Sequence, residues 1–251
     1  MPTNLSILAL GALGMAAFGA RLKPDLDDFD ASLPSLLCIL VSGLAATLWS
    51  TDSQTQPVLQ GQTFVYQTWQ DFFFHVREIS AFANAKGAGT LYHFRMSDAP
   101  ALLYHFANYL SASAISFATN TPAVQIYSSF QLPFGIFLTG IAAFSLIASI
   151  WGSWPALAAT AAVVLLPDAY QQGFANKYLS YAFMSQVNLG SLYGIACAAL
   201  AWIFMLEGSR RGKIMAVLVG YVFLAICLFY KAHLFVANSF LILIYPCIFF
   251  P

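Results

Sequence analysis

The chain has 251 residues, of which 60% are hydrophobic and only 8% are charged. A soluble domain carries roughly a quarter charged residues, so this composition excludes an ordinary soluble globular protein. Ten basic and ten acidic residues cancel, which leaves no net field to attract nucleic acid. The composition therefore predicts an all-α, polytopic membrane protein whose function depends on its few polar residues.

Seven apolar segments are candidate membrane spans, because an apolar run of about 18 residues with few charges is typical of a transmembrane helix. They cover residues 4–20, 34–50, 130–151, 154–167, 189–207, 214–230 and 233–251. No basic residues precede the first run, so we expect an uncleaved helix there and not a signal peptide. The apolar run that reaches Pro251 indicates a single transmembrane domain, residues 1–251, cut from a longer protein.

The long stretch 51–129 between the second and third spans holds much of the polar sequence. Within it, segment 100–118 is long enough to cross a membrane but contains His105, Asn108 and several serines. Its apolar residues favour one side at helical spacing, which is typical of a helix lying at the interface. If this helix lies flat, 51–129 is a single outer loop, and if it crosses, everything before it is inverted.

Basic residues in short loops indicate the cytoplasmic side, and the sequence SRRGK at 209–213 is the clearest such loop. The turn at 151–154 is then cytoplasmic as well, and the loop 51–129 is outside when 100–118 lies flat. All four histidines fall on that outer side. Charges held against a membrane cost about 2.5–3.5 kcal/mol each on insertion scales, so this gathering predicts a site at the outer surface.

The densest polar cluster lies in residues 69–78, which include Asp71 and His75. As a helix, this segment places Asp71, His75 and Glu78 on one face, because positions i, i+4 and i+7 stack. An Asp–His pair at this spacing acts as a general base with its orienting partner, or as two ligands of a metal. The alternative is an interfacial helix whose polar face contacts water and lipid headgroups.

Other candidate residues have two interpretations each. His105 is either a site residue or a histidine satisfied by a nearby hydroxyl or carbonyl. Asp168, directly after Pro167, marks either the water boundary or a site. Lys231 and His233 interrupt an apolar stretch, and Lys231 is either a snorkelling side chain at a turn or a cation placed for a phosphate. Nucleotide-binding, HExxH and GxSxG motifs are absent from the sequence.

The order of these features resembles the N-terminal half of the GT-C superfamily of membrane glycosyltransferases. The carrying features are Asp71 followed closely by His75, a Pro-led segment containing Tyr104-His105, two spans joined by a tight turn, and Leu166-Pro167-Asp168 after the second of them. The resemblance covers about residues 34–251.

In that superfamily the first outer loop carries a catalytic acidic residue and two helices parallel to the membrane, matched here by Asp71 and by residues 70–85 and 99–116. Two departures are the additional span 4–20 and the lack of the usual C-terminal soluble domain within these residues.

The resemblance implies transfer of a sugar from a polyprenyl-phosphate carrier to an acceptor on the extracytoplasmic side of the plasma (inner) membrane. Asp71 would act as the base or as a carboxylate associated with a divalent cation, while His75 and His105 would position the sugar or acceptor. Lys231, together with Arg95, would hold the phosphate, and Asp168 and His233 would belong to the same substrate-binding region. The identities of the sugar and acceptor, and any metal requirement, stay open.

Two other classes of protein compete with this interpretation. A transporter would place ionisable residues near the membrane midplane and would show matched halves, and the sequence has neither feature. A non-catalytic membrane subunit, or a truncated remnant, is favoured by the small number of spans.

Overall fold

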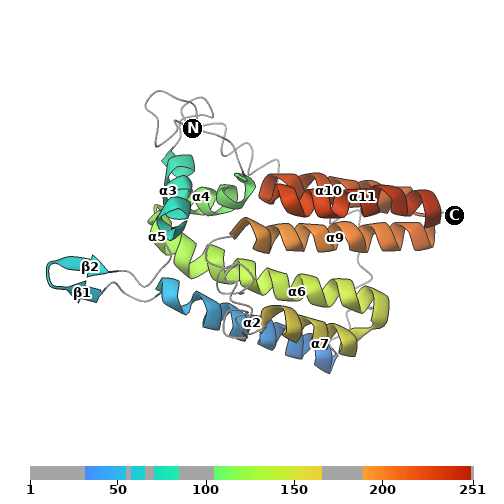
Figure 1. Ribbon diagram of the computed structural model, residues 1–251, viewed down its shortest axis with the longest axis horizontal. Coiled ribbons are helices and arrows are strands. Elements are labelled where there is room, and N and C mark those ends of the chain that lie inside the picture. The colour runs from blue at the N-terminus through green and yellow to red at the C-terminus, as the bar shows by residue number, and fades with distance from the viewer. Residues whose placement is uncertain (1–31, 55–57, 66–70, 85–104, 166–188, 250–251) are drawn as a thin grey trace.

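The computed structural model describes residues 32–54, 58–65, 71–84, 105–165 and 189–249. Apart from one short hairpin, the regular structure in these residues is helical (Figure 1). The helices are α2 (Leu33–Gln54), α3 (Asp71–Asn84), α4 (Ala107–Thr119), α5 (Ala123–Ile126), the π-helix η3 (Tyr127–Gln131), α6 (Leu132–Trp151), α7 (Ser153–Val164), α9 (Leu189–Arg211), α10 (Ile214–Tyr230) and α11 (Ala232–Phe249).

Four helical stretches in the described part of the chain are long and apolar enough to cross a membrane: Leu33–Thr51, Ala123–Trp151, Leu189–Arg211 and Ala232–Phe249. The prediction of a helical membrane protein is confirmed. Two further apolar helices occupy predicted spans but are shorter, because α7 has 12 residues and α10 has 17. At 1.5 Å per residue these are about 18 Å and 26 Å long, against a hydrocarbon layer of about 30 Å. The predicted span 4–20 lies outside the described residues.

Small residues allow the long helices to approach one another closely. Helix α6 packs against α2, α7 and α9, while α10 and α11 pack against α9. A Cβ atom added at Gly140 of α6 would collide with Ser42 of α2, and one added at Gly220 of α10 would lie 2.9 Å from Met205 of α9. Close backbone approach through small residues is the usual way in which helices associate in a membrane, where hydrophobic burial supplies little driving force.

Helix α6 is the end of a longer continuous helical run, Ala123–Trp151. The predicted span began at residue 130, whereas the helix begins directly after Pro122, which has an extended backbone (φ −55°, ψ 137°). The first two turns of this run contain polar residues, so the apolar pattern in the sequence starts later than the helix does. The five residues of η3 interrupt the α-helical pattern, and they bury Tyr127, Ser128 and Gln131. Such π segments occur frequently at functional sites.

The helices α3, α4 and α5 gather at one end of the long helices, which we call the α3–α5 end (left in Figure 1). The turn between α10 and α11 lies at the same end, since Phe106, directly before α4, packs its ring 5.6 Å from that of Phe229 in α10. The opposite end holds the turns at Gly152 and Gly212. These two turns are neighbours, because Arg210 donates a hydrogen bond of 3.0 Å to the carbonyl oxygen of Ser149.

The ambiguous segment 100–118 forms a short helix at the α3–α5 end. Helix α4 has 13 residues, which gives a length of about 20 Å, too short to cross a membrane by itself. It packs against α3, and Ser113 of α4 donates a hydrogen bond of 2.9 Å to the carbonyl oxygen of Ile79. Residues 100–104 lie outside the described part of the chain.

A β-hairpin in the stretch 51–129 was not predicted. Strand β1 (Val58–Gln60) pairs antiparallel with β2 (Thr63–Val65), in a register that sets Val58 opposite Val65. The turn contains Gly61 at a φ of 64°, a left-handed conformation that glycine adopts without strain. Strands of three residues are too short for an alternating pattern to be recognised in the sequence.

Candidate functional site

The predicted helix over Asp71 and His75 is present as α3, and it buries one face. Phe72, His75 and Ile79 are all buried, with exposed fractions of 4%, 6% and 0%. Their spacing of three and four residues is that of one helical face. His75 therefore points into the protein and not toward a lipid headgroup, as the interfacial alternative required. Asp71 is the first residue of α3, and its side chain lies outside the described part.

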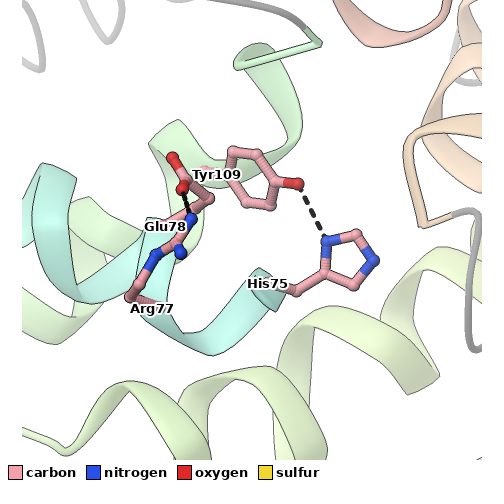
Figure 2. A network of polar contacts seen from close by, with 4 residues as sticks. All are labelled: His75, Arg77, Glu78 and Tyr109. Atoms are coloured by element: carbon pink, nitrogen blue, oxygen red, sulfur yellow. Dashed lines mark hydrogen bonds and ion pairs between the residues drawn. The ribbon is translucent and has the colours of Figure 1, made fainter. Parts of the chain in front are cut away.

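Two aromatic residues far along the chain hold the His75 imidazole. Its Nδ1 atom lies 2.8 Å from the hydroxyl oxygen of Tyr109 in α4, as Figure 2 shows. The ring of Tyr127, from η3, stacks on the imidazole with a centroid distance of 5.6 Å and an interplanar angle of 12°. The imidazole is therefore fixed both by a hydrogen bond at its edge and by a parallel ring on its face.

Glu78, predicted to share a face with Asp71 and His75, is engaged elsewhere. It forms an ion pair with its sequence neighbour Arg77 (Figure 2). The Arg77 guanidinium also lies 5.0 Å from the centre of the Phe74 ring, a distance at which a cation is attracted to an aromatic face. Both charged side chains are half-buried, so this pair belongs to the outer surface of α3 and not to the surroundings of His75.

His105, Lys231 and His233 were predicted from separate segments, and the structure brings them together. Burial lowers the pKa of His105 to about 4, and the positive charges of Lys231 and His233 act in the same direction. His105 also has a φ of 52°, a left-handed backbone conformation that costs a residue with a side chain about 1–2 kcal/mol. The fold therefore holds a strained histidine close to a lysine.

Lys231 is the residue at which α10 turns into α11. Its backbone is extended (φ −161°, ψ 108°), and its N–H donates a hydrogen bond of 2.8 Å to the carbonyl oxygen of Cys227. The side chain is half-buried, and burial lowers the pKa of the ammonium group. The turn rests against two glycines of α9: a Cβ at Gly190 would collide with the Tyr230 carbonyl oxygen, and one at Gly194 would lie 3.6 Å from the Lys231 side chain.

A row of buried polar contacts, which we call the polar seam, connects the His75 region with the Lys231 turn. The side-chain amide of Gln131 in η3 donates a hydrogen bond to the carbonyl oxygen of Asn108, the residue before Tyr109. The Tyr193 hydroxyl of α9 donates to the carbonyl oxygen of Gln131 at 2.6 Å. The Tyr193 ring in turn stacks on that of Tyr230, with a centroid distance of 5.8 Å and an interplanar angle of 12°.

The seam also contains acceptor groups that the described residues leave unsatisfied. The amide oxygens of Asn108 and Gln131 are buried and have no hydrogen-bond partner among the described residues. An unmet buried acceptor costs about 1–3 kcal/mol. This part of the site is therefore suited to a group that carries hydrogen-bond donors, such as a hydroxyl group or a water molecule.

The other two predicted site residues, Arg95 and Asp168, lie outside the described residues. Within the described residues, no group of three or more His, Cys, Asp or Glu side chains is arranged to hold a metal ion. Sequence reasoning missed the residues that organise the site: Tyr109, Tyr127, Gln131 and Tyr193. One sequence signal could have located part of the site. The Gly190–Gly194 pair has the GxxxG spacing that is typical of close helix packing, and these two glycines contact the Lys231 turn.

Comparison with known proteins yields no match. No family model matches the chain, and neither a curated protein nor a solved structure is similar enough to match it.

Proposed function

We propose that the protein is a membrane glycosyltransferase that transfers a sugar from a polyprenyl-phosphate donor to an extracytoplasmic acceptor, as the resemblance to the GT-C superfamily implies. One observation carries the proposal. Helix α3, which begins at Asp71, and the turn at Lys231 lie at the same end of the long helices. A base and a phosphate-binding cation must share one surface of the membrane, and placement at opposite ends would have ruled out this function.

Lys231 is suited to bind the phosphate of the donor. The two ion pairs in the described part of the chain, Arg77–Glu78 and Arg211–Glu207, do not involve it. His105 and His233 lie close enough to interact with its charge. A half-buried cation without a carboxylate partner attracts an anion strongly, because the surrounding dielectric is low. In sugar transfer, negative charge develops on the departing phosphate, and a preorganised cation stabilises it.

Asp71 is suited to activate the acceptor. It lies four residues before His75 in the same helix, so the two residues share a face of α3. As the base, Asp71 takes the proton of the acceptor hydroxyl while the hydroxyl oxygen bonds to the anomeric carbon of the sugar. The bond from that carbon to the phosphate oxygen breaks, and the electron pair leaves with the phosphate toward Lys231. His75 and His105 position the sugar and the acceptor.

Membrane orientation is a further part of the proposal. The basic residues Arg210, Arg211 and Lys213 lie at the end opposite to α3. Because basic residues of short loops stay in the cytoplasm, the candidate site faces the extracytoplasmic side. Helix α4 is too short to cross by itself and packs against α3, which supports an outer loop over residues 51–129.

The test is a transfer assay with membranes that contain the protein and a panel of labelled polyprenyl-phosphate sugars. The substitution Asp71→Asn removes the base but keeps the size of the side chain, and we expect it to abolish transfer while leaving the amount of folded protein unchanged. The matched control is Asp52→Asn, the same exchange near the end of α2. Preserved turnover in the Asp71→Asn variant would remove Asp71 from the mechanism, and absence of transfer from every donor by the wild-type protein would overturn the function.

A further inference from the structure

The side chain of Lys231 runs along α9 toward the N-terminus of that helix. A Cβ atom added at Gly194 would lie 3.6 Å from the Lys231 Cβ, and one added at Gly190 would lie 3.6 Å from its Cδ. The stem therefore passes from Gly194 to Gly190, a shift of about 6 Å at 1.5 Å per residue. Because only one carbon separates Cδ from Nζ, the ammonium group lies beside the first turn of α9, which begins at Leu189.

A cation in this position is unfavourable unless an anion accompanies it. The N-terminus of a helix carries the equivalent of roughly half a positive charge, so it stabilises anions and not cations. The first turn of α9 contains no acidic residue, and neither ion pair of the described residues involves Lys231. Within the described part of the chain, the ammonium group and the helix terminus therefore lack a compensating negative charge.

The hydroxyl group of Ser191 adds an unsatisfied donor at the same place. Ser191 lies in the first turn of α9 and is 1% exposed, and its Oγ atom has no hydrogen-bond partner among the described residues. Side chains of a helix lean toward its N-terminus, so Ser191 leans toward the end at which the Lys231 ammonium lies. At about 100° per residue, Ser191 is only about 60° around the helix from Gly194.

A phosphate group suits this combination of donors. The N–H groups in the first turn of a helix have no acceptors within the helix, and phosphates bind at helix N-termini for this reason. Lysine supplies a point charge for a phosphate, and a phosphate has enough oxygen atoms to accept hydrogen bonds from the helix and the serine as well. Access is from the turn, where Lys231 is half-buried and His233 is exposed.

We propose that the N-terminus of α9, the Ser191 hydroxyl group and the Lys231 ammonium group form one phosphate-binding site. Ser191 and the N–H groups of the first turn donate hydrogen bonds to the phosphate oxygens, and Lys231 balances their charge. The inference deepens the proposed function and rests on it for the identity of the ligand, the phosphate of a polyprenyl-phosphate donor. A free phosphate ion has the same chemistry, so the experiment compares both sources.

The test is the binding of polyprenyl phosphate to the whole protein in detergent micelles that contain no phosphate, measured by titration calorimetry. In the Ser191→Ala variant, we expect the dissociation constant to rise about tenfold, equivalent to about 1.4 kcal/mol, the size of a hydrogen bond to a charged group. The matched control is Ser209→Ala, near the other end of α9. Ser209 is 2% exposed and also has an unpartnered Oγ among the described residues, but its substitution should leave the dissociation constant unchanged.

A second measurement separates binding from a structural role of Ser191. Removal of a buried hydroxyl group that has no partner does not cost stability. Without ligand, the Ser191→Ala variant should therefore unfold at the same denaturant concentration as the wild-type protein or at a higher one. Equal dissociation constants for the two serine variants would overturn the inference. Equal affinity of the wild-type protein for polyprenyl phosphate and for the uncharged polyprenol would overturn it even if a variant failed to fold.

Titration with inorganic phosphate distinguishes the two sources of the ligand. Tighter binding of polyprenyl phosphate than of inorganic phosphate, with both weakened by Ser191→Ala, supports a site for the lipid headgroup. Equal affinity for the two would support the phosphate site but contradict the polyprenyl-phosphate donor. Binding as expected without any detectable sugar transfer would contradict the proposed function and leave the phosphate site intact.

Discussion

At the α3–α5 end of the long helices, several polar side chains are buried and held by contacts within the protein, whereas the basic side chains at the opposite end are exposed. His75, Asn108 and Gln131 are at most 6% exposed. Arg211 and Lys213 are exposed at the other end, together with Trp151 and Trp154, which are 66% and 61% exposed. The exposed set combines basic and aromatic residues, a composition typical of a membrane interface.

The difference concerns how the polar groups are satisfied. Exposed charges need only water and headgroups, so the turns at Gly152 and Gly212 can be short and local. Buried polar groups need protein partners, and those of His75, which lies in α3, come from two other elements, α4 and η3. The structure of the α3–α5 end therefore depends on contacts between residues that are far apart in the sequence, as expected of a functional site.

The largest expected contrast between the two ends is in catalysis. The substitution Lys231→Met removes the charge at the α3–α5 end but keeps the apolar stem, and Lys213→Met does the same at the opposite end. Loss of one stabilising group for a developing negative charge typically lowers kcat about 10²–10³-fold, so we expect a loss of that size for Lys231→Met only. The measurement is the rate of sugar transfer per folded protein molecule. Equal losses of rate in the two variants would show that the α3–α5 end is no more important for transfer than the opposite end.

A smaller contrast concerns packing of the Lys231 turn. A Cβ at Gly190 collides with the Tyr230 backbone, whereas a Cβ at Gly43 of α2 meets nothing within 4 Å. We expect Gly190→Ala to destabilise the protein by about 1–3 kcal/mol because overpacking displaces the backbone. The control Gly43→Ala should be neutral or stabilising by up to about 1 kcal/mol. Both values come from denaturant unfolding in detergent micelles, and equal stability of the two variants would argue against close contact between α9 and the turn.

The smallest expected effect is a pH dependence that arises at His105. Burial, together with Lys231 and His233, lowers its pKa from 6.5 to about 4. The unfolded chain therefore binds a proton at His105 more readily than the folded chain does between these values. Stability should be unaffected by His105 above pH 6.5 and should decrease as the pH falls toward 4. The measurement is the midpoint of unfolding as a function of pH. A His105→Gln variant should show a smaller decrease of this midpoint between pH 6.5 and 4 than the wild-type protein. An equal decrease in both would contradict the placement of His105 beside Lys231.

Several features of the fold could be predicted from residue type and spacing alone. The apolar runs at 34–50, 189–207 and 233–251 contain almost no charges, so helices able to cross a membrane followed directly from the energetics of burying charge in lipid. The helix over Asp71 and His75 was also predictable, and so was a helix within 100–118, although its shortness was not. The start of the helical run Ala123–Trp151 was not, since Gln125 and Ser128 make its first turns appear polar.

The site itself could be predicted only as a set of candidates. His105, Lys231 and His233 stood out because ionisable residues are rare in this chain. Tyr109 and Tyr127 did not stand out, because they are two of 12 tyrosines and nothing in their spacing identifies a hydrogen bond to a residue 34 positions away.

The sequence by itself determined that the chain enters a membrane and which of its residues are too polar to face lipid, since both follow from the free energy of transferring each side chain. Only the tertiary structure decided which of those residues meet. The contacts of His75 with Tyr109 and of Lys231 with α9 depend on how helices dock, and docking depends on the shapes of many side chains at once. Which side chains contact one another at the α3–α5 end is therefore decided by the packing of the whole molecule and not by any one segment.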